Sequence, residues 1–261
     1  GIRDFSRSRG LGYVYKRQSE PSKCARLYSH RHKDMTAAKK NSDNCQARSN
    51  ATKSALMRAA EHLIAKHGME NVSISDIVAA AEQKNQSALQ YHFTNLRGLI
   101  DAIVLARSEQ THNRRAELIE ALFAKSERPT LREICMLMVY PAFSLARENP
   151  DYHRYIKAFG HQLMLSETSL LPMVRRHGGG GASGIQTDEL LRLALPHLKG
   201  ADFERRMEAA IRLCSASMYH QARQKNAFNG KQSQQFLYSL VDAIVGLLSG
   251  PVSDESKALG E

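Results

Sequence analysis

The feature that most constrains this chain is a helical period of apolar residues that runs from about residue 50 to residue 249. Within this stretch, apolar side chains recur three and four positions apart, as they do on the buried face of an amphipathic helix. No segment shows the strict alternation of apolar and polar residues that is typical of a half-buried strand. The sequence therefore predicts an all-α fold.

Residues that begin or end helices stand at the breaks in this period. Gly68 is suited to end a helix. The residues suited to begin a helix are Ser73, Asp76, Thr130, Glu133, Asn149 and Pro150. The predicted helices cover residues 50–67, about nine residues from Ser73, a short stretch through Ser87–Gln90, and then 95–124, 130–147, 150–165, 186–198, 201–226 and 231–249. Pro141 should kink the helix that contains it. The glycine-rich run over 178–184 is expected to be a flexible connector.

The net charge of +11 is concentrated at the start of the chain, where residues 1–49 hold 12 Lys and Arg against 4 Asp and Glu. Residues 1–48 have no helical or strand period, so we expect a disordered basic tail, with a DNA-gripping arm as the alternative. The segment from Met35 to Lys40 resembles a natural translation start, which would place residues 1–34 outside the native protein.

Several function classes find no support in the sequence. The four cysteines form no C-x-x-C pair, and no metal-ligand spacing, phosphate loop or nucleophile elbow is present, so we expect no metal and no cofactor, and an enzyme is only a remote alternative. No stretch has the roughly 18 apolar residues of a membrane span, and no apolar signal-peptide core follows the first basic residues. We therefore expect a cytoplasmic protein.

The segment from Ser73 to Leu99 has the organisation of a helix-turn-helix: a capped helix, a polar turn, and a second short helix. A helix that reads bases in the major groove needs polar side chains on one face and apolar side chains against its own domain. The apolar residues are Ala88, Leu89 and Phe93, and the outward polar residues are Asn85, Gln86, Ser87 and Gln90. Asn and Gln amides can bond adenine through two hydrogen bonds.

One segment of the sequence resembles one branch of the TetR family of repressors: Lys84-Asn85-Gln86-Ser87-Ala88-Leu89-Gln90-Tyr91-His92-Phe93. The resemblance extends over residues 52–105. It implies a three-helix DNA-binding domain, a fourth helix that links it to a regulatory domain, and a dimer that binds a palindromic operator on double-stranded DNA. Candidate phosphate contacts are Thr52, Lys53, Ser73, Ser75, Lys84, Tyr91 and His92.

Three positions depart from the pattern of that family. Glu82 takes the place of the usual glycine in the turn, which is one residue longer than usual, and Gln90 takes the place of the usual tyrosine. Leu96 stands where a basic residue usually opens the fourth helix, and the adjacent Arg97 would face another direction.

The resemblance also assigns roles in the C-terminal half, where the last two helices of family members form a four-helix bundle with a second subunit. Candidate homodimer residues are Met207, Ile211, Met218, Phe236, Leu240, Ile244 and Leu248. A mixed aromatic and thioether lining could hold a small-molecule effector, and its candidates are Met136, Tyr140, Phe143, Tyr155, Phe159, His161 and Met164. Ordinary core packing is the alternative for both sets.

The predicted organisation is a tail over residues 1–48, a helix-turn-helix domain over 49–97, a helical regulatory and dimerisation domain over 98–250, and a disordered tail over 251–261. The expected function is a transcriptional regulator, a repressor that a small molecule releases from its operator. A DNA-binding regulator or architectural protein without an effector is the alternative.

Overall fold

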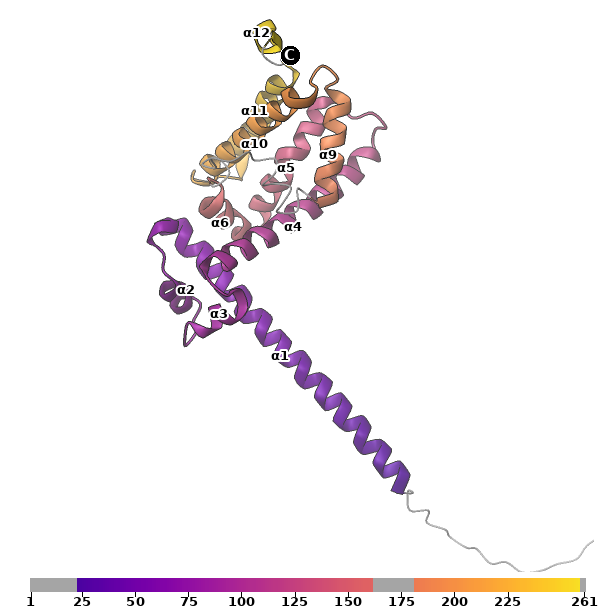
Figure 1. Cartoon of the computed structure of the whole chain (residues 1–261), viewed down its shortest axis with the longest axis vertical. Coiled ribbons are helices and arrows are strands. Elements are labelled where there is room, and N and C mark those ends of the chain that lie inside the picture. Colours follow the sequence, from indigo (N-terminus) through magenta and orange to yellow (C-terminus); the bar gives the residue numbers. More distant parts are fainter. Residues whose placement is uncertain (1–22, 162–180, 259–261) are drawn as a thin grey trace, which may run out of the picture. The chain divides into compact units, whose positions relative to one another are not determined.

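A computed structural model describes residues 23–161 and 181–258, and all of the regular structure within these ranges is helical (Figure 1). The helices are α1 (Lys23–His67), the 3-10 turn η1 (Met69–Asn71), α2 (Ile74–Ala80), α3 (Ser87–Phe93), α4 (Leu96–Phe123), α5 (Leu131–Glu148), α6 (Pro150–Phe159), α9 (Gly181–Ala194), α10 (Gly200–Ala222), α11 (Gly230–Ser249) and α12 (Asp254–Ala258). The all-α prediction is confirmed. None of the described helices is long and apolar enough to cross a membrane.

Helix α1 begins much earlier than predicted, so the expected disorder of residues 23–48 is wrong, while residues 1–22 lie outside the described part. The chain has no glycine or proline from Ser22 to His67, and Ala, Lys, Arg and Gln are good helix formers, so nothing local interrupts the helix. The absence of an apolar period marks a segment without a core, which does not exclude a helix. The chain divides after Asn50 into two units, and the second contains the hydrophobic clusters described below.

The first cluster joins α1 to α4 and forms the core around α2 and α3. Its fully buried side chains include Leu56, Ile77, Leu89, Leu99 and Ile103, which come from all four helices. Gly68 ends α1 with a φ of +81°, as its position after the last apolar residue predicts. This cluster holds α2 and α3 against one another and against the beginning of α4.

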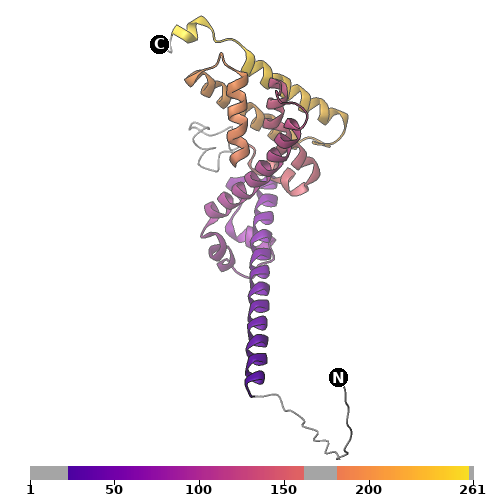
Figure 2. The same ribbon diagram turned by 90° about the vertical axis from the view of Figure 1, so that its right-hand side faces the viewer.

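The second cluster lies among α5, α6, α9, α10 and α11, with Phe143, Phe203, Leu191, Leu195 and Ile244 among its most buried side chains. Thr130 and Glu133 form the predicted capping box at the beginning of α5, and Asn149 caps α6. Helix α9 packs against both α4 and α5 (Figures 1 and 2).

The predicted connector over 178–184 is helical from Gly181 onward, so the expectation of a flexible segment is wrong for residues 181–184; residues 178–180 are outside the described part. Gly181 has a φ of +56° at the helix start, where glycine is readily accommodated. Ser183 is buried and its hydroxyl donates to the carbonyl oxygen of His112 on α4 at 2.9 Å. A tertiary contact thus outweighs the low helix propensity of the glycines.

Candidate nucleic-acid interface

The predicted capping box at the beginning of α2 is present. The Ser73 hydroxyl accepts a hydrogen bond from the backbone N–H of Asp76 at 3.2 Å, and the Asp76 carboxylate accepts from the backbone N–H of Ser73 at 3.0 Å. The Ser73 hydroxyl also donates to that carboxylate, and these bonds lower the pKa of Asp76. Helix α2 therefore begins at a fixed residue, with Ile77 and Val78 buried behind it.

The turn after α2 is a Schellman motif with a glutamate in the glycine position. The backbone N–H of Gln83 donates to the carbonyl oxygen of Val78, and that of Glu82 donates to Ala79, both at 3.0 Å. Glu82 has a φ of +55°, in the left-handed region that glycine adopts most easily. The departure from the family pattern at this residue thus leaves the turn type intact, at the cost of backbone strain.

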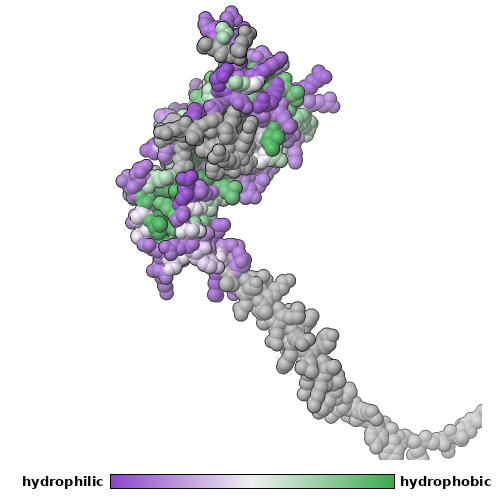
Figure 3. Space-filling model, viewed as in Figure 1, coloured by the Kyte–Doolittle hydropathy of each residue, from purple (hydrophilic) through white to green (hydrophobic). Residues whose placement is uncertain are grey.

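Helix α3 presents the two faces that the sequence predicts. Leu89 and Phe93 are buried, and Ala88 is half-buried against the same cluster. The exposed residues are Lys84, Asn85, Gln86, Ser87, Gln90 and Tyr91. Tyr91 is 82% exposed, which is unusual for a large aromatic side chain and leaves its ring and hydroxyl open to a partner. Figure 3 shows purple and pale side chains along the lower edge of the part of the molecule where Figure 1 places α2 and α3, with some green side chains above that edge.

Two of the polar candidates already make hydrogen bonds within the domain. The Asn85 side-chain oxygen accepts from the backbone N–H of Ser87 at 3.0 Å, so it helps to begin α3. The Gln86 side-chain nitrogen donates to the Ser75 hydroxyl at 2.7 Å, which ties the beginning of α3 to α2. Gln90 makes no such contact with the described side chains, and its amide extends from the exposed face of the helix.

The remaining candidates surround this face. Lys53 is exposed on α1, with its ammonium 5.9 Å from the centre of the Phe93 ring, and Thr52 and His92 are half-buried. Arg97 is exposed, with its side chain 86% accessible and 3.8 Å from the Asp101 carboxylate, whereas Leu96 packs on the core. A basic side chain is therefore present at the beginning of α4, one residue after the expected position.

The junction between α3 and α4 is tightly constrained. Thr94 has φ +67° and ψ −48°, and the backbone N–H of Asn95 donates to the carbonyl oxygen of Phe93 at 2.7 Å. This is the geometry of a classic γ-turn, which is rare and strained. Gly98 lies so close to the end of α3 that a Cβ atom there would be 2.1 Å from the Phe93 carbonyl oxygen. The orientation of α3 on α4 thus depends on the absence of a side chain at Gly98.

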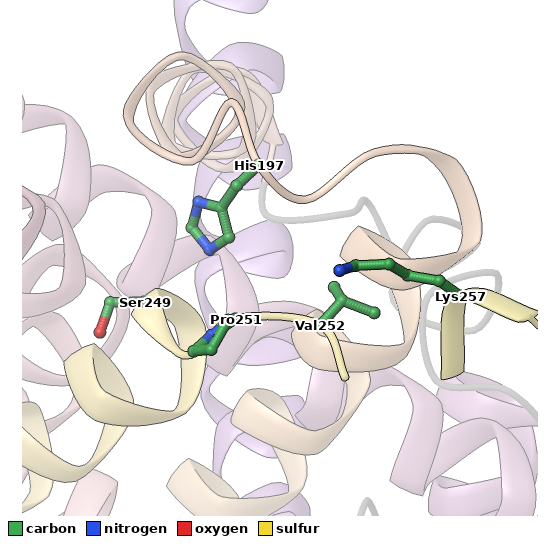
Figure 4. A pocket seen from close by; sticks show the side chains of 5 residues that line it. All are labelled: His197, Ser249, Pro251, Val252 and Lys257. Atoms are coloured by element: carbon green, nitrogen blue, oxygen red, sulfur yellow. The ribbon is translucent and has the colours of Figure 1, made fainter. Parts of the chain in front are cut away.

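Most of the residues predicted to bind an effector are divided between the two hydrophobic clusters. Phe143 and Phe159 are buried in different clusters, and Tyr155 contacts both. Met136 and Tyr140 lie at the edge of the second cluster, the His161 ring is tilted against the Tyr219 ring with their centres 5.3 Å apart, and Met164 is outside the described residues. A surface hollow of about 340 Å³ is lined by a different set, His197, Ser249, Pro251, Val252 and Lys257 (Figure 4).

Five of the seven predicted dimer residues are buried within one protomer: Met207, Met218, Leu240, Ile244 and Leu248. Their side chains pack in the second cluster, so the apolar period of α10 and α11 marks the side that faces the protomer's own core. Ile211 and Phe236 are half-buried. The outward side of α11 instead carries Tyr238, Ser239, Asp242, Ala243 and Gly246.

A buried ion pair between Glu61 on α1 and Arg107 on α4 was not predicted from the sequence. Glu61 lies three residues before Ile64, on the side of α1 that is otherwise apolar, and a carboxylate within an apolar stripe is the signal that could have identified it. Its partner could not be identified in this way because it lies 46 residues further along the chain. No cluster of three or more metal-ligating side chains occurs among the described residues.

Comparisons with known proteins agree with this geometry. Residues 56–103, which include α2 and α3, match the sequence pattern of the family described as bacterial regulatory proteins, tetR family. A search of curated proteins finds no match.

The solved structures to which this chain is similar include two bacterial proteins. A TetR family transcription regulator from Marinobacter aquaeolei VT8 is 16% identical, with a TM-score of 0.50 over 78% of this chain and 98% of that one. GusR from Salmonella enterica is 20% identical, with a TM-score of 0.47 over 76% and 96% of the two chains.

Proposed function

We propose that this chain is a DNA-binding transcriptional regulator of the TetR family and not an enzyme, and that it is a repressor that a small molecule releases from its operator. One observation carries the DNA-reading part of this proposal. Helix α3 buries its apolar side, while its amide and hydroxyl side chains are exposed on a strongly constrained scaffold. Such a helix can enter a major groove and bond to base edges.

We assign base reading to Gln90 first, with Gln86 and Ser87 beside it. Asn85 is a weaker candidate for base reading because its oxygen already caps α3. Phosphate contacts are assigned to Lys53, and also to Thr52, Ser73, Ser75, Lys84, Tyr91 and His92 around the rim. A regulator that contacts the chromosome in this way would work in the cytoplasm.

Selection of bound sequences from random duplex DNA, followed by affinity measurements, tests this assignment. Gln90→Ala should reduce the preference for the selected site, since a good bidentate base contact contributes roughly 1–3 kcal/mol of discrimination. Lys53→Ala should weaken binding to all duplexes alike and reduce the slope of affinity against salt concentration. Gln186→Ala, at an exposed glutamine on α9, is the matched control. An unchanged sequence preference in Gln90→Ala would contradict the placement of the recognition helix.

We further propose that the protein binds a palindromic operator as a homodimer through the outward sides of α10 and α11. The exposed Tyr238, Ala243 and Gly246 support this choice, because an isologous interface needs small or apolar groups that the protomer leaves uncovered. Gly246→Glu adds a charge at a position where, apart from the adjacent backbone of α11 itself, no described atom of the protomer lies within 4 Å of the new Cβ atom. Light scattering should then show a monomer for this variant and a dimer for the original chain and for Gln186→Glu.

Release by an effector is the regulatory part of the proposal. A ligand that binds better to a conformation with misplaced recognition helices lowers operator affinity by its differential affinity for the two states. The candidates for its contacts remain Met136, Tyr140 and Phe143 on α5, Tyr155 and Phe159 on α6, and His161 and Met164 after α6. A thermal-shift screen against a small-molecule panel distinguishes a regulator that binds an effector from one that has none. A ligand that binds only the native state raises Tm.

A further inference from the structure

Glu61 is the one fully buried charged side chain among the described residues, and its contact with Arg107 joins α1 to α4. The Arg107 Nε donates to Glu61 Oε1 and its Nη2 donates to Glu61 Oε2, both at 2.8 Å. The Arg107 side chain is only 11% exposed. Two parallel bonds between a planar guanidinium and a carboxylate fix the orientation of the groups as well as their distance.

The pair joins the part of the chain that matches the DNA-binding family to the part that does not. Glu61 lies within the matched residues 56–103, and Arg107 lies just beyond them on α4. Thr111 donates to the backbone carbonyl oxygen of Arg107 at 2.9 Å, and its hydroxyl is 2.6 Å from the hydroxyl of Tyr152 on α6. Tyr152 is buried in the second cluster, so the contacts extend from the DNA-binding domain into the regulatory core.

The continuation of α4 is fixed to the regulatory half by separate contacts. Arg114 donates to both carboxylate oxygens of Glu148 at the end of α5, at 3.2 and 2.6 Å. Arg115 donates through Nε to the carbonyl oxygen of Leu137 on α5 at 3.1 Å. Because α4 is held to α5 at this level, the Glu61–Arg107 pair connects the helix-turn-helix domain to the part of α4 that is fixed to the regulatory half.

Stability is a poor explanation for such a pair. Removing two charges from water is costly, and replacing a buried ion pair with apolar side chains of similar volume is often neutral or stabilising. Burial raises the pKa of Glu61, which shows the cost of placing this carboxylate away from water, while the hydrogen bonds from Arg107 oppose that shift. What the pair does provide is a fixed relative orientation of the guanidinium on α4 and the carboxylate on α1.

We propose that Glu61 and Arg107 are positioning residues that set the direction of the helix-turn-helix domain on α4, and thereby the operator half-site spacing that the protein accepts. The inference rests on the proposed binding of a palindromic operator by a dimer. A dimer reads two half-sites at one fixed separation, so a small change in the domain's direction displaces both recognition helices from the bases.

The test replaces both charges at once with Glu61→Met and Arg107→Met, which leaves no unpaired charge in the interior. Binding is measured on selected operators whose central spacer has its optimal length or is one base pair shorter or longer, and on random duplex DNA. The double variant should retain its fold in urea denaturation and its affinity for random DNA. It should lose on the order of tenfold in affinity for the optimal operator and accept the three spacers almost equally, because misplaced base contacts cost about 1–3 kcal/mol each.

The matched control is the double variant Asp188→Met and Arg192→Met, which removes an ion pair lying wholly within α9. Its spacer preference should stay that of the original chain. The inference is overturned if the Glu61 and Arg107 double variant keeps its spacer preference, if the control loses the preference equally, or if affinity for random DNA falls as much as affinity for the operator. Failure of the original chain to select any duplex would instead overturn the proposed function.

Discussion

Glu82 adopts a backbone conformation that its side chain does not favour. A residue with a Cβ atom in the left-handed region costs roughly 1–2 kcal/mol relative to the right-handed one, and glycine escapes most of this cost. The two Schellman hydrogen bonds around Glu82 hold it in place, so the turn between α2 and α3 carries strain.

Replacing Glu82 with glycine should therefore stabilise the protein by up to about 1 kcal/mol, partly offset by the greater freedom of glycine in the unfolded chain. Urea denaturation measures the change. Glu82→Ala is the control because alanine retains the strain while removing the same carboxylate. Equal stabilities for the glycine and alanine variants would show that backbone strain is not released.

Arg115 differs from its neighbours on α4 in having no carboxylate within 4 Å among the described residues. Arg107 and Arg114 each pair with an acid, and these bonds raise their pKa against the effect of burial. Burial instead lowers the pKa of Arg115, whose Nε is satisfied by a carbonyl oxygen. A desolvated charge without a counter-charge is unfavourable to the fold.

Arg115→Met should accordingly raise stability, by about 1 kcal/mol after the loss of one hydrogen bond is included. Arg114→Met should have the opposite sign, since it removes both hydrogen bonds from Arg114 to Glu148 and leaves that carboxylate only the more distant Arg147, at 3.5 Å. Thermal denaturation of both variants under the same conditions compares them. A loss of stability in Arg115→Met as large as that in Arg114→Met would contradict this account.

At the scale of elements, the α3–α4 junction is where a single added methyl group should have the largest effect. The Phe93 carbonyl oxygen occupies the space that a Cβ atom at Gly98 would need, and Phe93 is fixed by burial in the first cluster. Neither backbone can move without displacing the recognition helix.

Gly98→Ala should therefore destabilise the protein by roughly 1–3 kcal/mol, as overpacking does elsewhere, and should reduce operator binding more than binding to random DNA. Stability is measured by urea denaturation and binding by titration of labelled duplexes. Arg97→Ala, at the exposed neighbouring position, is the control for stability and should change it by less than about 0.5 kcal/mol. A Gly98→Ala variant as stable as the original chain would show that the junction is adaptable.

The two capping boxes should contribute to the acid sensitivity of the fold. The Asp76 carboxylate is stabilised by hydrogen bonds from Ser73, and the Glu133 carboxylate by those from Thr130, so both pKa values are lowered. A group with a lowered pKa in the folded state contributes stability above its unfolded pKa, and that contribution is lost as the pH falls through the folded value.

A variant with Asp76→Asn and Glu133→Gln should be less stable than the original chain at pH 7, and this difference should shrink as the pH falls below about 4. Urea denaturation over that pH range measures it. Glu120→Gln, at an exposed glutamate on α4, is the control: its stability should differ from that of the original chain by the same small amount at every pH. A difference that stayed constant with pH would show that the caps act without their charge.

At the scale of the whole molecule, α6 contributes to both hydrophobic clusters. Tyr152 and Ile156 are buried in the second cluster, and Ala158 and Phe159 are buried in the first. A helix that fills two cores makes their stabilities interdependent. The helix-turn-helix domain therefore has no core that is independent of the regulatory half.

Phe159→Ala should lower the free energy of unfolding by about 3–5 kcal/mol, the usual cost of removing a buried phenylalanine side chain. The loss should appear both in a probe of the first cluster and in a probe of the second, such as thiol labelling at Cys135. Phe123→Ala, at a partly exposed phenylalanine at the end of α4, should cost much less. Independent unfolding of the two clusters in the original chain would contradict this coupling.

The sequence by itself determined the features that depend on residues within about four positions of one another. The helical period, the capping boxes at Ser73 and Thr130, the end of α1 at Gly68 and the two faces of α3 all follow from local chemistry. The placement of apolar residues showed which sides of α10 and α11 are buried but not what covers them, which is why most of the predicted dimer residues lie in the protomer's own core.

Only the tertiary structure decided the contacts between distant residues. The pairing of Glu61 with Arg107, the approach of Phe93 to Gly98, and the helical state of residues 181–184 each depend on how whole helices pack, which no local pattern specifies. The physical reason is that such contacts arise when burial aligns separate elements. The local preferences of one sequence can be satisfied in many arrangements of its helices. The partner of a residue in a long-range contact therefore cannot be identified from the sequence alone.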